Sequence, residues 1–155
     1  MSHIVLVVVP DHAGGGAERR YLIVEERDGT FFLPAGRVEP NENLMAAAVR
    51  ETAEEAGLLI GLQGILGIDH EPHRMRFCFV GYAAVDMPPK SRPDRHSRAA
   101  HWLTKAEIAR MPLRHPEVLD WIERAERATA LLPCAAYQPH GLSVPSVSLP
   151  LAQHP

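Results

Sequence analysis

The sequence predicts a single α+β domain, and three observations support this fold class. Short runs of β-branched and aromatic residues, typical of strands, alternate with turn residues along much of the chain. An alanine-rich segment over residues 43–57 is typical of a helix, and a late strand over residues 101–103 leads into a further helical region. The 155 residues suffice for one domain with a sizeable core and are too few for two typical domains.

The predicted strands are short apolar or alternating runs bounded by turn residues. Asp28 and Gly29 form a turn signal between two of them, and Pro34 ends the next one. The glycine-rich residues 10–17 predict a surface turn rather than a phosphate-binding loop, because no Lys-Ser/Thr pair follows them. Prolines among basic residues over 87–98 predict an exposed loop. The predicted strands cover residues 4–9, 21–26, 30–33, part of 58–69, 74–85 and 101–103.

Capping residues locate the predicted helices. Gly57 stands where a helix over residues 43–57 would end in a left-handed residue. Thr104 and Glu107 have the spacing of a capping box, in which two side chains bond free N–H groups at a helix start. The later predicted helices cover residues 105–110 and 116–129, the second with an apolar face of Leu119, Ile122 and Ala125.

Charge and composition exclude some classes of partner. The formal net charge is −3, so we expect neither nucleic acid nor an anionic membrane as a partner, because both need a basic surface. The apolar run over residues 4–9 is too short to span a membrane and lacks the features of a signal peptide. Cys78 and Cys134 make no disulfide framework, which favours a reducing compartment, and a cytoplasmic location is expected by default.

The last residues differ in composition from the rest of the chain. After Arg127 the sequence contains no Lys, Arg, Asp or Glu, while proline recurs. We therefore divide the chain into a domain over residues 1–130 and a Pro-rich, uncharged arm over residues 131–155. The arm is expected to lie on the domain or on a partner subunit, and the second case would make the protein a homodimer. The alternative is that the arm forms part of a substrate pocket.

A helical wheel for the predicted helix separates an acidic face from an apolar one. Glu51, Glu54 and Glu55 fall within roughly 100° of one another. The opposite side has apolar residues at helical spacing and is predicted to pack on the core. This predicted core face consists of Met45, Val49, Thr52 and Ala56, whereas Leu44, Ala47 and Ala48 fall on the glutamate side.

The acidic face is unfavourable for a purely structural helix. Like charges three and four residues apart repel each other, and anions near a helix C-terminus oppose the helix dipole. Arg50 is the one basic residue near enough in the sequence to compensate. A hard divalent cation such as Mg²⁺ resolves the conflict, because it takes clustered carboxylate oxygens as ligands. A solvated charged face is the alternative that the three glutamates alone leave open.

Residues 36–58 resemble the Nudix box in sequence and spacing. The box consists of glycine, five residues, glutamate, seven residues, Arg-Glu-aliphatic, one residue, Glu-Glu, one residue, and Gly-aliphatic. The matching residues are Gly36, Glu42, Arg50, Glu51, Glu54, Glu55, Gly57 and Leu58. Thr52 departs from the pattern, but it has nearly the shape of valine, and its hydroxyl can bond a carbonyl one turn back. Residues 33–40 before the box and 101–108 after it also resemble the family, so the chain is similar to Nudix (MutT-like) hydrolases over about residues 4–128.

The resemblance implies a fold, a metal site and a reaction. The fold would be a mixed β-sheet flanked by helices in an α/β/α sandwich. The implied ligands of Mg²⁺, or of Mn²⁺ in its place, are Glu51, Glu54, Glu55 and the Gly36 carbonyl. The three glutamates and Arg50 would be the catalytic residues, with Arg50 orienting a glutamate and Glu42 steadying the loop or Arg50. The reaction would cleave a pyrophosphate linkage in a nucleoside di- or triphosphate or another nucleoside diphosphate derivative.

Residues outside the helix are further candidates for the site. Asp94 could be an extra ligand or base, but an exposed residue paired with an arginine is the favoured interpretation. Glu71 is an alternative base in a connection that could face the cleft, and the arginines of the loop over residues 91–98 could hold phosphates. The candidate substrate-binding residues are Arg37, Glu71, Arg76 and Asp94.

Two other functions compete with the hydrolase. An isopentenyl-diphosphate isomerase on the same scaffold would need further cysteine and glutamate machinery, and Cys78 falls within a strand pattern with no evident partner. A non-catalytic ligand-sensing module would be expected to lack the Glu-Glu pair, whereas Glu54 and Glu55 are both present. The complete set of carboxylates therefore favours metal-dependent turnover.

Overall fold

The computed structural model describes residues 1–13 and 15–134 and contains two β-sheets. The larger sheet has the strand order β4-β1-β6-β5. Its strands are β1 (Ser2–Val8), β4 (Ala35–Arg37), β5 (Ile60–Glu71) and β6 (Arg74–Ala83). β1 and β6 are parallel and the other neighbours are antiparallel, so this sheet is mixed, as predicted.

The second sheet has three antiparallel strands in the order β3-β2-β7. Its strands are β2 (Arg20–Glu25), β3 (Phe31–Phe32) and β7 (Ala99–Thr104). The two sheets are connected where the chain leaves β1, because Leu22 donates its N–H to the Val9 carbonyl at 3.0 Å. The Asp11 N–H continues this pairing by bonding the Arg20 carbonyl at 2.8 Å.

Two helices have the capping residues that the sequence predicts, namely Gly57 at the end of one and the box of Thr104 and Glu107 at the start of another. The helices are the 3₁₀ helix η1 (Gly16–Glu18), α1 (Leu44–Ala56), α2 (Lys105–Ile108) and α3 (Glu117–Arg127). α1 begins after Asn43, whose side chain accepts the Ala46 N–H at 2.8 Å, and ends at Gly57, which has φ 68°. α2 begins with the predicted capping box of Thr104 and Glu107.

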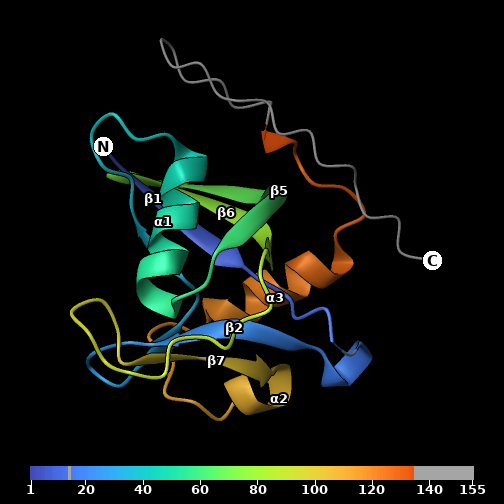
Figure 1. The fold of residues 1–155 in the computed structure, drawn as a ribbon. Helices are drawn as coiled ribbons and strands as arrows, with labels where there is room; N and C mark the ends of the chain where they lie inside the picture. The colour runs from blue at the N-terminus through green and yellow to red at the C-terminus, as the bar shows by residue number, and fades with distance from the viewer. Residues whose placement is uncertain (14, 135–155) are drawn as a thin grey trace.

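Helices α1 and α3 lie on opposite sides of the strands (Figure 1). One core cluster joins α1 to alternate strand residues, among them Val5, Val7 and Leu22. The other joins α3 and Ile108 of α2 to the strand residues in between, such as Leu6. Because successive strand residues point to opposite faces, the two clusters form the two interfaces of the predicted α/β/α sandwich.

The core face predicted for α1 is wrong in part, because the buried face is wider. The buried residues of α1 are Leu44, Ala47, Ala48, Thr52 and Ala56. The helix contacts strands of both sheets, and its small alanine side chains permit a close approach. Met45 and Val49 pack on the same core but stay partly exposed. The Thr52 hydroxyl donates to the Ala48 carbonyl at 2.8 Å, which is the bond expected one turn back.

The structure corrects three further expectations. α2 is shorter than predicted and ends at Ile108. The buried residues of α3 are Val118, Trp121 and Ile122. Leu119 and Ala125, which were predicted on its apolar face, are only partly buried at the margin of the cluster. β4 was not predicted, because Pro34 precedes it and Gly36 lies within it, and its pairing with β1 makes it a strand.

After α3 the chain returns to the larger sheet. Ile65 of β5 donates its N–H to the Leu132 carbonyl at 2.8 Å, and Leu132 donates back at 3.0 Å. The first residues of the predicted arm therefore lie on the domain, while residues 135–155 fall outside the described residues. In the described part of the chain, no helix has both the length and the apolar composition needed to cross a membrane.

Candidate functional site

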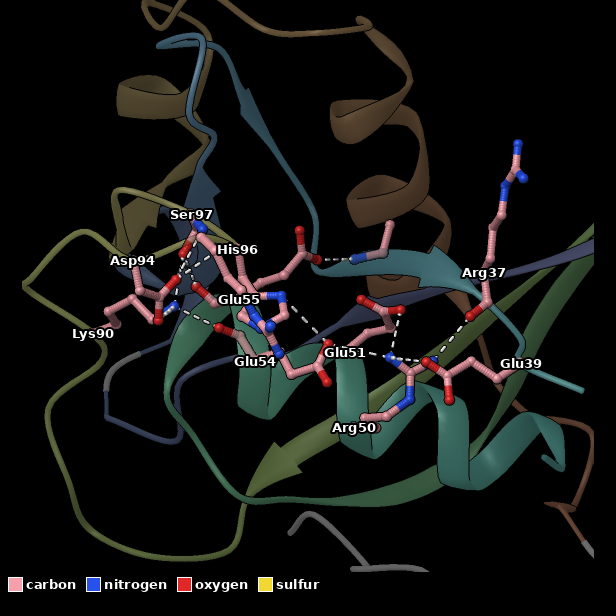
Figure 2. Close-up of polar contacts among 12 residues, drawn as sticks. Arg37, Glu39, Arg50, Glu51, Glu54, Glu55, Lys90, Asp94, His96 and Ser97 are labelled. Carbon is pink, nitrogen blue, oxygen red and sulfur yellow. Dashed lines mark hydrogen bonds and ion pairs between the residues drawn. The ribbon is translucent and has the colours of Figure 1, made fainter.

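Four predicted site residues lie on one side of α1, next to β4 (Figure 2). They are Arg50, Glu51, Glu54 and Glu55, all from the C-terminal half of the helix. β4 passes close by because its pairing with β1 sets Gly36 opposite Val5, a residue of the core cluster that contains α1. The loop over residues 90–98 meets the C-terminal end of the same helix.

Arg50 connects most of the acidic groups of the site. Its Nε and Nη2 donate to the two carboxylate oxygens of Glu42 at 2.7 and 2.9 Å. Its Nη1 donates to Glu51 at 2.8 Å and to Glu54 at 3.2 Å, and Nη2 also donates to the Arg37 carbonyl at 2.9 Å. These are contacts by which an arginine can orient glutamates. The hydrogen bonds from Arg50 lower the pKa of Glu42 below its usual value.

Gly36 leaves room for the Glu51 carboxylate. A Cβ atom at residue 36 would lie 2.0 Å from Cδ of Glu51, so any side chain there would displace this carboxylate. The Glu51 side chain is 14% exposed, and burial raises its pKa although Arg50 opposes the shift. Gly36 and Glu51, which supply a predicted carbonyl ligand and a predicted carboxylate ligand, are therefore in direct contact.

Glu55 lies between α1 and the start of β4. Its Oε1 accepts the Ala35 N–H at 2.8 Å. Burial raises the pKa of Glu55 to about 8, with Glu51 and Glu26 adding to the shift and with Ala35 and Arg114 opposing it. Since this value lies above neutral pH, the carboxyl keeps its proton unless further positive charge is brought to it.

Glu54 faces the loop over residues 90–98. Its Oε2 lies 3.2 Å from Nη1 of Arg50 and 3.6 Å from Nδ1 of His96. Its backbone carbonyl accepts a hydrogen bond from the Lys90 ammonium group. The negative end of α1 therefore has a second basic neighbour besides Arg50, which the sequence did not connect with the helix.

The side chains on this side of α1 have the chemistry that a hard divalent cation requires of its ligands. They are oxygen donors, and burial makes the anionic forms of Glu51 and Glu55 unfavourable without added positive charge. Within residues 1–13 and 15–134, no three acidic, histidine or cysteine side chains converge on one point. Arg50 holds Glu51 and Glu54, while Glu55 is bonded to the backbone of β4. Metal binding would therefore replace part of these hydrogen bonds.

Arg37 and Arg76 lie on the other face of the larger sheet. Both are in register with Ile4 of β1, which packs in the core cluster on the α3 side. Figure 2 shows the Arg37 side chain directed away from α1. The structure thus brings these two candidates near each other, but on the face of the sheet opposite the glutamates.

Arg76 is held by carboxylates from two elements. Its Nη1 lies 2.7 Å from Oε1 of Glu117 on α3, and its Nη2 lies 2.7 Å from Oδ2 of Asp69 on β5. Its Nε is buried and has no hydrogen-bond partner among the described residues. This guanidinium is therefore largely neutralised, and a third carboxylate, that of Glu71, lies 3.6 Å from its Nε.

Glu71 and Asp94 are each engaged by a cation outside α1. Glu71 accepts two hydrogen bonds from Arg74, at 2.7 and 3.0 Å, at the turn between β5 and β6. The expectation that Asp94 pairs with an arginine is wrong, because its carboxylate lies 2.7 Å from the Lys90 ammonium group. The hydrogen bond from Lys90 lowers the pKa of Asp94 to about 2.

The structure adds Glu26 and Arg114, which sequence reasoning missed. A segment after α2 pairs with β3, since Arg114 donates its N–H to the Phe31 carbonyl at 3.0 Å. The Arg114 guanidinium then lies 2.8 Å from Glu26 and 3.9 Å from the centre of the Phe32 ring. Both charges act on the pKa of Glu55. No local pattern signals this arrangement, because it depends on the pairing of distant segments.

A recess elsewhere on the protein contains no residue of α1. It has a volume of about 700 Å³ and lies where η1, β2, α2 and α3 meet. Its Tyr21 hydroxyl donates to Glu126 at 2.8 Å, and its Lys105 ammonium lies 2.9 Å from the same carboxylate. These polar groups therefore bind each other, and the acidic side of α1 is the better candidate site.

The sequence matches the family model of the NUDIX domain over residues 3–122. This match covers most of the chain, so the chain belongs to the Nudix family. It includes both sheets, α1 and the loop over residues 90–98.

Similar proteins agree with this family. The human 8-oxo-dGDP phosphatase NUDT18 is 33% identical over 99 residues, which cover 63% of this chain and 30% of the human protein. This chain thus matches less than a third of the length of that relative. A Nudix hydrolase structure from Nitrosomonas europaea has a TM-score of 0.73 and 28% identity, covering 90% of this chain and 97% of the other. An ADP-ribose pyrophosphatase structure from Streptococcus suis shares the fold, with a TM-score of 0.66, 18% identity and coverage of 85% and 96%.

Proposed function

We propose that this chain is a Mg²⁺-dependent hydrolase that cleaves a pyrophosphate linkage in a nucleoside diphosphate derivative. The observation that carries this proposal is the group of Glu51, Glu54 and Glu55 on one side of α1, connected through Arg50 and β4. These carboxylates and the Gly36 carbonyl would hold the ion, and Mn²⁺ could replace Mg²⁺. The raised pKa values of Glu51 and Glu55 support the proposal, because a bound cation would favour their anionic forms.

In the proposed reaction, water attacks one phosphorus atom of the pyrophosphate linkage. A new P–O bond forms, the bridging P–O bond breaks, and the bridging oxygen leaves with the other phosphate. A carboxylate of α1 accepts the proton of the attacking water. When bound, the metal ion supplies charge neutralisation for the phosphates and lowers the pKa of a water molecule. Arg50 orients Glu51 and Glu54 toward the ion through the contacts that metal binding leaves in place.

The substrate class follows from the relatives and from the cations near the site. The name of the human relative indicates an oxidised nucleoside diphosphate, which we take as the first candidate. Arg114, beside Glu55, is a candidate for contact with the phosphates. Arg37 and Arg76 are candidates for contact with the rest of the nucleotide, from the other face of the larger sheet. Glu71 and Asp94 are weaker candidates, since both are already paired with cations.

The isomerase is disfavoured by the position of its candidate cysteine. Cys78 is 0% exposed and packs in the cluster on the α3 side, away from α1. Burial also raises the pKa of its thiol well above the usual range, so it is a poor nucleophile or acid at neutral pH. Both described cysteines are free thiols, which fits the cytoplasmic location that we propose with this activity.

The test is release of phosphate or pyrophosphate from a nucleotide panel, with and without Mg²⁺. The panel contains 8-oxo-dGDP, dGDP, the corresponding triphosphates and ADP-ribose. We expect turnover that requires the metal and is lost in the double variant Glu54→Gln/Glu55→Gln. Glu123→Gln, on the exposed side of α3, is the matched control and should keep full activity. Unchanged turnover in the double variant would remove the mechanism, and a panel without any substrate would favour the ligand-sensing module.

A further inference from the structure

The C-terminal end of α1 is completed by residues from a distant loop. The last four carbonyl groups of an α-helix have no partner further along the helix. In α1 the first of them, on Ala53, accepts the Gly57 N–H at 3.0 Å. The other three accept hydrogen bonds from Lys90 and Ser97, which lie in the loop after β6.

These bonds hold the turn that carries two of the glutamates. The Lys90 ammonium group donates to the Glu54 carbonyl, and the Lys90 N–H donates to the Ala56 carbonyl at 2.8 Å. The Ser97 hydroxyl donates to the Glu55 carbonyl at 2.6 Å. The backbone of each glutamate is therefore fixed by a side chain from outside the helix, which restricts where its carboxylate can go.

The Lys90 ammonium group has an acceptor for each of its three N–H bonds (Figure 2). Besides the Glu54 carbonyl, they are Oγ of Ser97 at 3.0 Å and Oδ2 of Asp94 at 2.7 Å. The Lys90 side chain is only 11% exposed, and Ser97 is 0% exposed. A tetrahedral ammonium group suits this arrangement, whereas the planar fork of an arginine does not.

Asp94 shapes the loop around this lysine. Its Oδ1 accepts the N–H groups of His96 and Ser97 at 2.8 and 3.2 Å, while its own N–H donates to the Ser97 carbonyl at 2.9 Å. The residue that neutralises Lys90 thus also sets the position of Ser97. It brings His96 to the side chain of Glu54, with Nδ1 at 3.6 Å from Oε2.

The charge of Lys90 has a direct electrostatic effect on the site. Carboxylates near a helix C-terminus are disfavoured by the negative end of the helix dipole, and a cation there is favoured. Lys90 places its positive charge on the Glu54 carbonyl, one residue from Glu55, in a position with little solvent screening. It therefore counters the negative end of the helix dipole at the turn that carries the two glutamates, while Asp94 balances its charge.

We propose that Lys90 is a positioning residue for Glu54 and Glu55 and that, through them, it sets the affinity of the site for a divalent cation. Ser97 shares this role by holding the Glu55 carbonyl, and Asp94 supports both. The inference rests on the proposed function only in taking the glutamates as metal ligands. It gives the basic loop a part in the site that is separate from substrate binding.

The chain contains two lysines, Lys90 and Lys105, which allows a matched comparison. Lys90→Met keeps the length of the side chain but removes its charge and donors, and Lys105→Met makes the same change between α2 and α3. Mn²⁺ binding is measured by electron paramagnetic resonance on each folded variant without nucleotide. We expect Lys90→Met to weaken Mn²⁺ binding by about 10- to 100-fold, as for residues that orient metal ligands, and Lys105→Met to leave it unchanged.

A folded Lys90→Met variant that binds Mn²⁺ as tightly as the wild type would overturn the proposal, as would a wild type that binds no Mn²⁺. If Lys90→Met does not fold, Ser97→Ala decides, because it keeps the charge of Lys90 and its bonds to the Glu54 carbonyl and Asp94. It removes the bond to the Glu55 carbonyl and one of the three acceptors of the ammonium group. We expect Ser97→Ala to weaken Mn²⁺ binding less than Lys90→Met, and unchanged binding would count against the role. Lys90→Arg should not restore wild-type affinity, since its geometry is planar, whereas full rescue would reduce the role to charge alone and contradict it.

Amine labelling tests the arrangement without metal or substrate. With a small acylating reagent, Lys90 should react much more slowly than Lys105, whose side chain is 35% exposed, as read by mass spectrometry. Equal rates would contradict the enclosed ammonium group. These readouts also separate the two proposals: if Lys90→Met weakens Mn²⁺ binding but no nucleotide is hydrolysed, the positioning role stands and the hydrolase is lost.

Discussion

Arg50 and Glu42 are joined by two parallel hydrogen bonds, Nε to Oε2 at 2.7 Å and Nη2 to Oε1 at 2.9 Å. A bidentate pair of this kind fixes the plane of the guanidinium group. That plane directs Nη1 to Glu51 and Glu54 on the same helix. The loop before α1 therefore orients the two carboxylates through Arg50, while the loop after β6 holds the backbone at the far end of the same helix.

The first prediction concerns this bidentate pair. Arg50→Lys keeps the charge but cannot bond both oxygens of Glu42 and still reach Glu51 and Glu54. We expect a loss of stability of about 1–2 kcal/mol in urea denaturation, because donors to partly buried carboxylates are lost. We expect kcat/KM with Mg²⁺ to fall by about tenfold or more, because the carboxylates lose their orientation. The control is Arg127→Lys, whose side chain is 71% exposed and which should change neither quantity.

The second prediction concerns the glycine against Glu51. In Gly36→Ala the new Cβ would meet the Glu51 carboxylate, which lies at the end of a flexible side chain and can move aside. We therefore expect a stability change of less than about 1 kcal/mol but a loss of Mn²⁺ affinity of about tenfold or more. Gly15→Ala is the control, since its Cβ would make only an ordinary contact at 3.8 Å. Wild-type Mn²⁺ affinity in Gly36→Ala would show that the position of Glu51 does not matter for the ion.

The third prediction is a pH dependence of the metal-free protein. Burial raises the pKa of Glu55 from 4.5 to about 8, so between these values the folded protein holds a proton that the unfolded chain has released. Rising pH therefore favours the unfolded state across this window. The stabilising effect of the protonated group is complete below pH 4.5 and is lost as the pH rises through about 8.

Urea denaturation in the presence of a chelator, at intervals between pH 4.5 and 8, measures this effect. Stability should decline with rising pH in the wild type, and the decline should be smaller in Glu55→Gln, which cannot titrate. Glu123→Gln should follow the wild type. If stability declined equally with pH in the wild type and in Glu55→Gln, Glu55 would not be the group that keeps its proton in the folded state.

Local sequence signals account for the parts of the structure that were correctly predicted. Gly57 and the Thr104–Glu107 box define helix ends through bonds within a few residues, so their spacing is sufficient evidence. The hydrogen bond from Arg50 to Glu54 follows in the same way, because residues four apart lie side by side on a helix. The helical wheel predicted the core face of α1 less well. The spacing of apolar residues along a helix does not reveal that strands from two sheets pack against it.

Tertiary pairing accounts for what the sequence did not show. In the sequence, Lys90 is one more basic residue of a predicted exposed loop. Only in the folded chain does its ammonium group donate to the Glu54 carbonyl. Arg114 reaches the neighbourhood of Glu55 because its segment pairs with β3. In both cases the partner lies far away in sequence, and arginine and lysine are too common on surfaces for composition to single out these two.

The last prediction concerns the contact between β5 and the start of the C-terminal arm. At Gly64 a Cβ would lie 2.7 Å from Cβ of Leu131 and 3.0 Å from the Leu132 carbonyl. The second atom is backbone, so Gly64→Ala should push the segment away from Ile65 and break the two hydrogen bonds that join it to β5. We expect a loss of about 1–3 kcal/mol, with faster amide exchange at Ile65 and Leu132.

The control for this contact is Gln63→Ala at the neighbouring residue of β5, whose side chain is exposed, and this variant should preserve the exchange protection. Light scattering on wild type and Gly64→Ala adds a second readout. If the arm joins two subunits, as one interpretation of its uncharged composition holds, the variant should shift the mass toward the monomer. Unchanged amide exchange at Leu132 would contradict the prediction. It would show that the added methyl group is accommodated without separating the two segments, so that the contact does not require glycine at residue 64.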